Sequence, residues 1–361
     1  MKVQKKEFLF GIFLTAIILS IIGCIVIYSA KSSESFIRSY AFKQCIVMFL
    51  GIFVSVFIFF LSYRFISFFT WIAYIGNVML LIAVLMMGVV RMGAQRWLVI
   101  GGFTIQPSEL CKITVILALA KYFSWDFDNR KSIRYFIFSF LIAGVPMLLI
   151  LKQPDLGTAM IIIPVLFSML FFIGANYYYL FGTIGLGLLS APLLWSRLAD
   201  YQKSRLLTFI NPNADPTGTG YTLLQSKVAI GSGGLYGKGW FHGTQTQLGF
   251  LPEKHTDFIF SVLGEEWGFI GALVVMFIYL VLIYYCLAVA DHSKNVFGKV
   301  ASVGLAVMLF THIFINIAMT LGLMPITGLP LPFLSYGGSS LMTNFIVIGL
   351  LLNTYKQRHW F

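Results

Sequence analysis

The sequence predicts an all-α, polytopic integral membrane protein with about ten transmembrane helices and one long extracytoplasmic loop. Three observations lead to this fold class. The 361 residues are 59% hydrophobic and only 11% charged, whereas soluble domains carry about 25% charged residues. Long apolar runs recur along the chain, and one long polar segment, 196–257, interrupts them. This composition excludes intrinsic disorder and a nucleic-acid-binding domain, although the net charge is +12.

The apolar runs are predicted to be helices, because a chain in lipid must satisfy its backbone hydrogen bonds internally. The first run, 8–28, follows the basic sequence MKVQKKE, but it is too long for a typical signal peptide and is predicted to be a retained span. The boundary near Gly174, between the predicted helices 156–174 and 177–195, is the least distinct. The other nine predicted helices lie at 42–61, 66–90, 108–123, 133–151, 156–174, 177–195, 267–290, 297–321 and 338–353.

The distribution of basic residues predicts that both termini are cytoplasmic. With the N-terminus inside, the short inner segments hold twelve Lys and Arg residues and the short outer segments hold six. An excess of positive charge marks the cytoplasmic side, whereas segments of about 60 residues, such as 196–257, translocate largely regardless of charge. We therefore predict a single multi-pass domain, residues 1–361, in the cytoplasmic membrane.

This topology places most of the unusual polar strings on the outer face. They are GAQRW, QPSELCK, KQPDLGTA, QSKVAIGSGGLYGKG, LPEKHTDF and LPLPFLSYGGSS. Polar groups that converge on one side of a membrane protein indicate a site there. The outer segments that hold these strings are 91–109, 152–155, 196–266 and 322–337.

Two pairs of these residues have both a structural and a functional interpretation. Glu109 and Lys112 are three residues apart, so on a helix they share a face and can neutralise each other or contact a ligand. Spacing alone leaves these alternatives equal. Arg96 and Trp97 fit an anchor at the membrane interface better, although the planar guanidinium could also bind a phosphate.

Asp257 is the carboxylate of greatest interest. It follows Lys254 and His255 and precedes an apolar run, so Thr256 or Asp257 could be the N-cap of a helix. The alternative is a general base at the edge of a cavity. Spacing alone favours the cap.

Three further patterns favour structural roles. The glycines of 231–239 do not fit a phosphate-binding loop or a dinucleotide fingerprint, and close backbone packing or a flexible lid explains them better. Asp126 and Asp128 are interpreted as part of a solvated charged turn. His312 and Asn316, one helical turn apart, are interpreted as an interhelical hydrogen-bonding patch rather than a proton relay. The sequence contains no Cys/His metal signature.

The polar strings together resemble the SEDS family of bacterial membrane proteins (shape, elongation, division and sporulation). The resemblance depends on GAQRW, QPSELCK, QPDLGTA, DPTGTGY, QSKVAIGSGGLYGKG, GTQTQLGFLPEKHTDFIFSVLGEEWGF and GLMPITGLPLPFLSYGGSSL, which span about 90–353. The GTQ, LGFLPE and HTDF sequences are more similar to those of the elongation members than to those of the division members. Trp267 is a mild departure, because division members tend to have Leu there.

The resemblance implies a peptidoglycan glycosyltransferase that polymerises lipid II into glycan strands on the outer face of the cytoplasmic membrane during cell elongation and shape maintenance. It implies that Asp257, in the HTDF string, is the catalytic base. It also implies substrate-binding roles for residues in the matching strings, namely Arg96, Trp97, Glu109, Lys112, Lys254 and His255.

The implied partners are lipid II, the growing glycan strand and a class B penicillin-binding protein with transpeptidase activity. No cofactor is assigned, although a divalent cation (Mg²⁺ or Mn²⁺) could share the charge of a pyrophosphate leaving group. Two alternatives remain for the function: a flippase for lipid II and a scaffold for a transpeptidase. Architecture alone does not separate a carrier from an enzyme.

Overall fold

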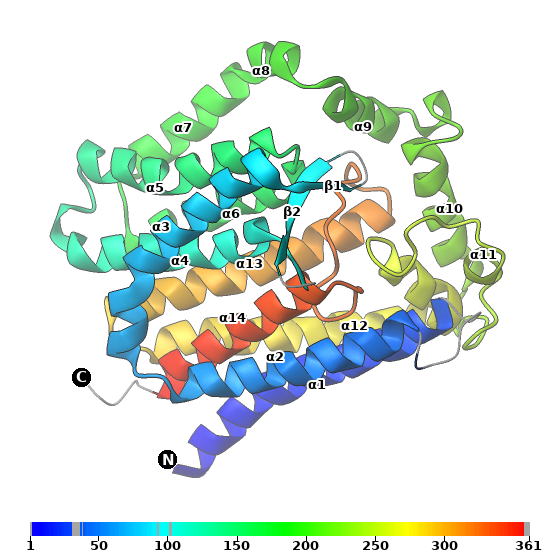
Figure 1. Cartoon of the computed structure of the whole chain (residues 1–361), viewed down its shortest axis with the longest axis horizontal. Coiled ribbons are helices and arrows are strands. Elements are labelled where there is room, and N and C mark those ends of the chain that lie inside the picture. The colour runs from blue at the N-terminus through cyan, green and yellow to red at the C-terminus, as the bar shows by residue number, and fades with distance from the viewer. Residues whose placement is uncertain (1, 31–36, 38, 92–93, 101–102, 357–361) are drawn as a thin grey trace. The chain divides into compact units, whose positions relative to one another are not determined.

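The computed structural model of the protein describes residues 2–30, 37, 39–91, 94–100 and 103–356. Most of this chain is helical, as predicted, and each of the ten predicted runs corresponds to a helix (Figure 1). These helices are α1 (Lys2–Ala30), α2 (Tyr40–Phe60), α3 (Tyr63–Met87), α4 (Pro107–Trp125), α5 (Ile133–Lys152), α6 (Leu156–Ile173), the pair α7 (Tyr177–Leu189) and α8 (Ala191–Arg197), α12 (Ile259–His292), α13 (Val296–Thr320) and α14 (Gly338–Lys356).

The predicted count of ten spans is not confirmed. Within the described part of the chain, seven helices are long and apolar enough to cross a bilayer, or eight if the bent pair α7 and α8 forms one span. Helices α4 and α14 lie at two of the predicted positions but are not among these seven. Polar side chains lower their hydropathy, such as Glu109 and Lys112 in α4 and Asn344 and Asn353 in α14.

The helix boundaries around Gly174 agree with the prediction. Gly174 has a left-handed backbone (φ 76°) and its N–H binds the last turn of α6, which ends the helix. The side chain of Asn176 then accepts a hydrogen bond from the N–H of Tyr178 and caps α7. The predicted run 177–195 is bent by 44° between α7 and α8, where Pro192 cannot donate a backbone hydrogen bond.

A small β-sheet was not predicted. Strands β1 (Val89–Arg91), β2 (Ala94–Ile100) and β3 (Phe103–Ile105) form an antiparallel sheet in the order β1-β2-β3. The predicted helix 66–90 therefore extends too far, since α3 ends at Met87 and the N–H of Gly88 closes its last turn on Val84. Strand pairing therefore orders part of the segment 91–109, which was predicted to lie on the outer face.

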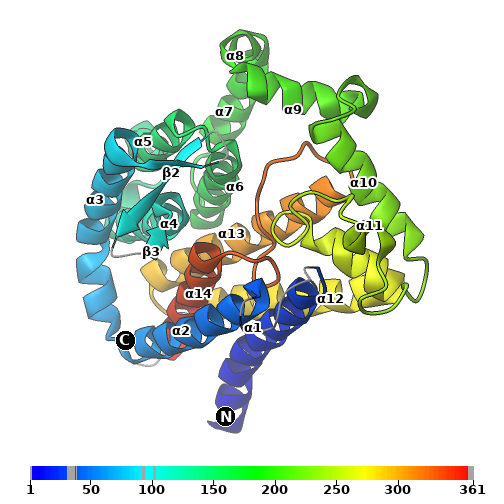
Figure 2. The same cartoon turned by 45° about the vertical axis from the view of Figure 1, so that its right-hand side comes forward.

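The polar segment 196–257 also contains regular structure. It forms α9 (Asp200–Ile210), the short 3₁₀ helix η3 (Pro212–Ala214), α10 (Thr219–Ser232) and α11 (Thr244–Gln247). Figure 2 shows α10 and α11 beside one end of α12. The predicted start of the next helix at 267 is wrong, because α12 begins at Ile259. A true break lies next to the predicted start, however, since Gly268 has a non-helical backbone (φ 66°).

The chain divides into two compact units. Unit 1 comprises Met1–Ile52, Leu194–Ile283 and His312–Asn344, and unit 2 comprises Phe53–Leu193, Tyr284–Thr311 and Phe345–Phe361. Helices α2, α8, α12, α13 and α14 contribute to both units.

Buried hydrogen bonds and close backbone approaches connect the elements of unit 1. The hydroxyl of Tyr279 in α12 donates to the carbonyl of Pro332 at 2.5 Å. Ser226 in α10 lies 2.7 Å from Ser261 in α12 and donates to the carbonyl of Thr320 at 2.6 Å. These contacts hold α10, α12, the end of α13 and the segment 321–337 together.

In unit 2, α4 forms the centre. It packs against α3, α5 and α6, and most of its residues are buried. A short 3₁₀ helix, η2 (Phe127–Asn129), follows α4. The amide of Asn353 in α14 donates to the carbonyls of Ile58, Phe59 and Leu61 and so joins the ends of two helices.

Candidate functional site

Asp257 lies in a tight turn that leads into α12. Glu253 has a left-handed backbone (φ 47°), and its carbonyl accepts hydrogen bonds from the N–H groups of Thr256 (3.1 Å) and Phe258 (3.4 Å). Because α12 begins at Ile259, Phe258 rather than Thr256 or Asp257 directly precedes the helix. This start does not support the cap interpretation, and the side chain of Asp257 is half-buried.

The segment 327–329 lies directly beside the Asp257 carboxylate. Gly328 has a left-handed backbone (φ 73°), and a methyl group on its Cα would lie 3.4 Å from Oδ2 of Asp257. Glycine therefore allows the main chain to adopt this conformation and to come close to the carboxylate. The absent side chain leaves space at Oδ2.

Asn316 connects the same two segments. Its Nδ2 donates to the carbonyl of Asp257 at 2.9 Å and to the carbonyl of Leu329 at 2.7 Å. The interpretation of His312 and Asn316 as an interhelical patch is therefore incomplete, because the partners of the Asn316 amide are loop carbonyls. His312 is buried on the same helix.

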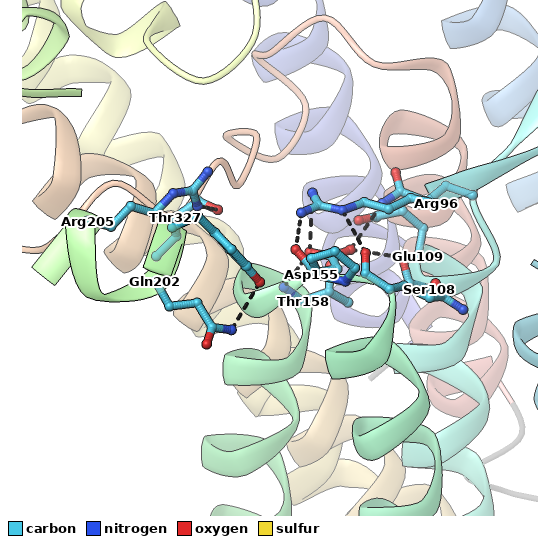
Figure 3. Close-up of polar contacts among 12 residues, drawn as sticks. Arg96, Ser108, Glu109, Asp155, Thr158, Gln202, Arg205 and Thr327 are labelled. Atoms are coloured by element: carbon cyan, nitrogen blue, oxygen red, sulfur yellow. Dashed lines mark hydrogen bonds and ion pairs between the residues drawn. The ribbon is translucent and has the colours of Figure 1, made fainter. Parts of the chain in front are cut away.

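Arg205 is a cationic residue of this region that sequence reasoning missed. It lies in α9, is half-buried, and donates from Nη1 to the carbonyl of Thr327 at 3.2 Å, as Figure 3 shows. Thr327 precedes Gly328 in the chain, so Arg205 holds the segment 327–329 that lies beside the Asp257 carboxylate. No local pattern distinguishes Arg205 from the other basic residues of 196–257, and only its tertiary contact does.

Lys254 and His255 bind the protein itself. The ammonium group of Lys254 donates to the carbonyl of Thr246. The imidazole of His255 stacks on Tyr40, with ring centroids 4.8 Å apart, and also lies 5.9 Å from the ring of Tyr336. These contacts hold the Lys254 and His255 side chains against the protein. The predicted substrate-binding roles of Lys254 and His255 stay predictions.

The glycines of 231–239 pack closely on α12. A methyl group on Gly233 would lie 2.0 Å from the carbonyl oxygen of Gly264, and one on Gly237 would lie 2.1 Å from that of Glu266. Backbone hydrogen bonds run in both directions, from Lys238 to Glu265 and from Phe269 to Gly234. Of the two uses predicted for these glycines, the structure supports close backbone packing.

Glu265 holds the neighbouring loop through a fully buried carboxylate. It accepts hydrogen bonds from the N–H groups of Gln245 (2.8 Å) and Thr246 (3.0 Å) and from the hydroxyl of Thr246 (2.8 Å). Lys238 forms an ion pair with it at 2.9 Å. Since Lys254 donates to the carbonyl of Thr246, Glu265 supports the turn that bears Asp257.

In unit 2, Arg96 lies in β2 and binds the turn between α5 and α6. Its guanidinium donates to the carbonyls of Gln153 (3.3 Å) and Pro154. It also lies 3.7 Å from Oδ1 of Asp155, and Figure 3 shows these two side chains facing each other. Arg96 therefore contacts the protein itself, and an anchoring role of Arg96 and Trp97 at the membrane interface stays a prediction. Trp97, next in the strand, is half-buried and pairs with Val89.

Asp155 is the hub of this cluster, and sequence reasoning missed it. Besides Arg96, it accepts hydrogen bonds from the side chains of Ser108 (3.2 Å) and Gln106 (3.3 Å). It also caps α6 by accepting from the N–H (3.3 Å) and hydroxyl (2.9 Å) of Thr158. The position of Asp155 before the helical run 156–174 was a capping signal that could have identified it.

Glu109 and Lys112 form the ion pair that their spacing permits. Oε1 of Glu109 and Nζ of Lys112 are 2.8 Å apart, and the two residues are 3% and 2% exposed. Burial to this degree supports the self-neutralising interpretation, because a charge without a partner is very costly there. Contact of either residue with a ligand stays a prediction.

The structure thus brings the predicted residues together in two groups. Asp257, Lys254 and His255 belong to unit 1, and Arg96, Trp97, Glu109 and Lys112 belong to unit 2. In the described part of the chain no group of three or more His, Cys, Asp or Glu residues could hold a metal ion. Asp126 accepts a hydrogen bond from Asn129 at 2.7 Å within an exposed turn, as predicted for a solvated charged turn.

Comparison with known proteins identifies the family. The model of the FtsW, RodA and SpoVE cell cycle proteins matches residues 10–359. The chain belongs to this family. It is 42% identical over 286 residues to the peptidoglycan glycosyltransferase MrdB of Escherichia coli K12, covering 79% of this chain and 77% of MrdB. It is 33% identical to the peptidoglycan glycosyltransferase RodA of Treponema pallidum, covering 96% and 97% of the two chains.

Solved structures agree with this membership. A chain from work on the structural coordination of polymerization and crosslinking by a peptidoglycan synthase complex superposes with a TM-score of 0.84 at 29% identity, covering 97% of this chain and 98% of the other. The rod shape determining protein RodA of Thermus thermophilus superposes with a TM-score of 0.72 at 28% identity, covering 97% of each chain. The family therefore accounts for both the fold and the motif strings.

Proposed function

We propose that the protein is a peptidoglycan glycosyltransferase that polymerises lipid II at the outer face of the cytoplasmic membrane. The observation that carries the proposal is the half-buried carboxylate of Asp257, beside Gly328, on a turn held by hydrogen bonds from other elements. The names of the relatives MrdB and RodA support the reaction class.

The proposed reaction is the transfer of a growing strand to an acceptor sugar. The C4 hydroxyl oxygen of the acceptor forms a bond to the anomeric carbon of the strand, and the bond from that carbon to undecaprenyl pyrophosphate breaks. The hydroxyl proton passes to the carboxylate of Asp257, which acts as the general base and later releases it to water. The pyrophosphate leaves with both bonding electrons.

The developing charge on the pyrophosphate requires cationic groups. The resemblance implied substrate-binding roles for Arg96 and Lys112, but in the structure both bind partners within unit 2. Arg205 is the better candidate, because it holds Thr327 next to Gly328 and therefore belongs to the same constellation as Asp257. A divalent cation remains part of the proposal only as an additional source of positive charge.

The proposed surroundings of the enzyme follow from the sequence and the family. The multiple apolar helices make it an integral membrane protein, and the excess of basic residues in the inner segments supports cytoplasmic termini. We propose a class B penicillin-binding protein as the partner, because the structure with a TM-score of 0.84 comes from a complex that couples polymerization to crosslinking.

The test is to supply fluorescent lipid II to the purified full-length protein in lipid nanodiscs, alone and with its partner transpeptidase. The proposal predicts glycan strands of many disaccharides and release of undecaprenyl pyrophosphate. A second arm places the protein in sealed vesicles with lipid II in the inner leaflet. Translocation of lipid II without polymerisation in either arm would contradict the proposal and assign the protein to the flippases.

A further inference from the structure

The turn that bears Asp257 leaves three successive carbonyl groups for partners outside the turn. Its internal hydrogen bonds, from Thr256 and Phe258, both use the carbonyl of Glu253. The first hydrogen bonds of α12 use the carbonyl of Phe258. The carbonyls of the half-buried residues 255–257 are therefore left for donors from other elements.

Three donors from the C-terminal part of unit 1 meet these carbonyls one by one. The N–H of Tyr336 donates to the carbonyl of His255 at 2.9 Å, and the hydroxyl of Ser335 donates to the carbonyl of Thr256 at 2.5 Å. The third donor, Nδ2 of Asn316, binds the carbonyl of Asp257 at 2.9 Å. We call these three donors, Asn316, Ser335 and the Tyr336 N–H, the carbonyl clamp.

The donors of the clamp are themselves held in place. The hydroxyl of Ser335 accepts a hydrogen bond from the N–H of Leu331 at 2.8 Å. The amide of Gln44, in α2, donates to the carbonyl of Ser335 at 3.0 Å and accepts from the N–H of Gly337 at 3.3 Å. Gln44, Ser335 and Asn316 are 1%, 4% and 0% exposed, so water does not compete for these bonds.

The amide of Asn316 has a further geometric consequence. Its second hydrogen bond goes to Leu329, the neighbour of Gly328, which lies beside Oδ2 of Asp257. One amide group therefore binds both the main chain of Asp257 and the segment that flanks its carboxylate. Without these two hydrogen bonds, the Asp257 carboxylate and the segment 327–329 beside it could move apart.

We propose that Asn316 and Ser335 are positioning residues that aim the Asp257 carboxylate by holding the backbone carbonyls of its turn. This inference rests on the proposed function, because it assigns Asp257 the role of base. A base must lie within hydrogen-bond reach of the proton it removes, and a displacement of about 1 Å costs as much as 100-fold in rate. The clamp fixes the main chain of residues 255–257 and therefore the position of the Asp257 carboxylate relative to the substrate.

The chain offers a matched control for a purely structural role. Asn353 in α14 is 1% exposed, and its amide donates to the carbonyls of Ile58 (2.9 Å) and Leu61 (2.7 Å). It has the same chemistry as Asn316 but belongs to unit 2. Asn316→Asp and Asn353→Asp each replace an amide donor by a carboxyl group that faces carbonyl oxygens.

The experiment compares the two variants and Ser335→Ala in nanodiscs, with the initial rate of polymerisation measured against lipid II concentration on equal amounts of folded protein. The clamp predicts that kcat of Asn316→Asp falls by about 100-fold, that Ser335→Ala loses less, and that KM changes little. Asn353→Asp should lose stability but keep its kcat. Equal kcat values for the two Asp variants, or a rise in KM that accounts for the loss, would overturn the inference.

Hydrogen exchange supplies a readout that does not depend on activity. Asn316→Asp and Ser335→Ala should accelerate exchange of the Tyr336 amide, which binds the carbonyl of His255, whereas Asn353→Asp should not. Unchanged exchange at Tyr336 in both clamp variants would overturn the inference. If the parent protein fails to polymerise lipid II, the proposed function fails, and the exchange experiment still decides whether the clamp exists.

Discussion

The Asp257 turn and the cluster around Asp155 both gather polar and charged groups, but they use them differently. In the turn, hydrogen bonds hold backbone carbonyls, and the carboxylate of Asp257 remains half-buried. In the cluster, charged side chains bind one another, as Arg96 binds Asp155 and Lys112 binds Glu109. The first arrangement presents a titratable group on a fixed main chain, whereas the second uses charge to join elements.

This difference separates two roles that similar sequence strings do not distinguish. A carboxylate that exchanges a proton with a substrate needs access to it, and the carboxylate of Glu109 is almost fully buried against its lysine. Variants in the Asp155 cluster should therefore act mainly on stability. Variants in the Asp257 turn should act mainly on rate.

The largest effect on stability is expected from breaking the Glu109–Lys112 pair. Lys112→Met leaves the Glu109 carboxylate buried without its cation and should lower the free energy of unfolding by about 3–5 kcal/mol. The double variant Glu109→Gln/Lys112→Met should recover most of this loss. Chemical denaturation in detergent measures both, with Lys43→Met at an exposed position as the control. A single variant as stable as the parent would refute the pairing argument.

A smaller loss of stability is expected at Asp155. Asp155→Asn removes the negative charge that binds Arg96 and weakens the acceptors for Ser108 and Thr158, so unfolding should become easier by about 1.5–3 kcal/mol. The same substitution at exposed Asp128 should change little. Equal melting temperatures for the two variants would show that the hub contributes nothing.

Gly328→Ala tests the region around the Asp257 turn. The left-handed backbone makes any side chain unfavourable by about 1–3 kcal/mol, and the new methyl group would lie 3.4 Å from Oδ2 of Asp257. Gly174→Ala is the matched control, since its φ is 76° and its nearest neighbour atom is 3.9 Å away. Both variants should lose stability, but only Gly328→Ala should also lose polymerisation rate per folded molecule. An equal loss of polymerisation rate in both variants would show that Gly328 has no specific role beside Asp257.

The smallest effect concerns Asp215, which lies before α10. Burial alone would raise the pKa of its carboxyl group, but hydrogen bonds from Thr219, Gly218 and Gly220 outweigh this and lower the pKa from its usual value of 3.8. A lowered pKa in the folded state means that the carboxylate stabilises the fold above about pH 4 and that this contribution disappears as the pH falls. The difference in melting temperature between the parent and Asp215→Asn should therefore shrink between pH 6 and the lowest tolerated pH. A difference that grows would contradict the sign.

The helices could be predicted because their signal is local. An apolar run of sufficient length has few alternatives to a helix in lipid, so all ten runs correspond to helices. The sheet β1-β2-β3 could not be predicted in this way, because its strands depend on pairing with each other. Helices α9 and α10 lie in a polar segment without a clear apolar period and gave no signal of their own.

The residues of the candidate site also differ in whether a local sequence pattern identifies them. Asp257 could be found from its string, and the Glu109–Lys112 pair from its spacing. The roles of Asn316, Arg205 and Asp155 depend on partners far away in the sequence, such as Leu329 for Asn316 and Thr327 for Arg205. No pattern in the sequence contains these contacts, because they arise only when the chain folds.

The most direct test of the account is the rate of glycan polymerisation by Asp257→Asn compared with Glu253→Gln. Glu253 is an exposed carboxylate in the same turn, so it controls for the loss of charge. The account predicts that Asp257→Asn retains its melting temperature and loses about 10²–10⁴-fold in rate, the contribution of a positioned general base, while Glu253→Gln retains most of its activity. Polymerisation by folded Asp257→Asn at the parent rate would contradict the assignment of Asp257 as the base.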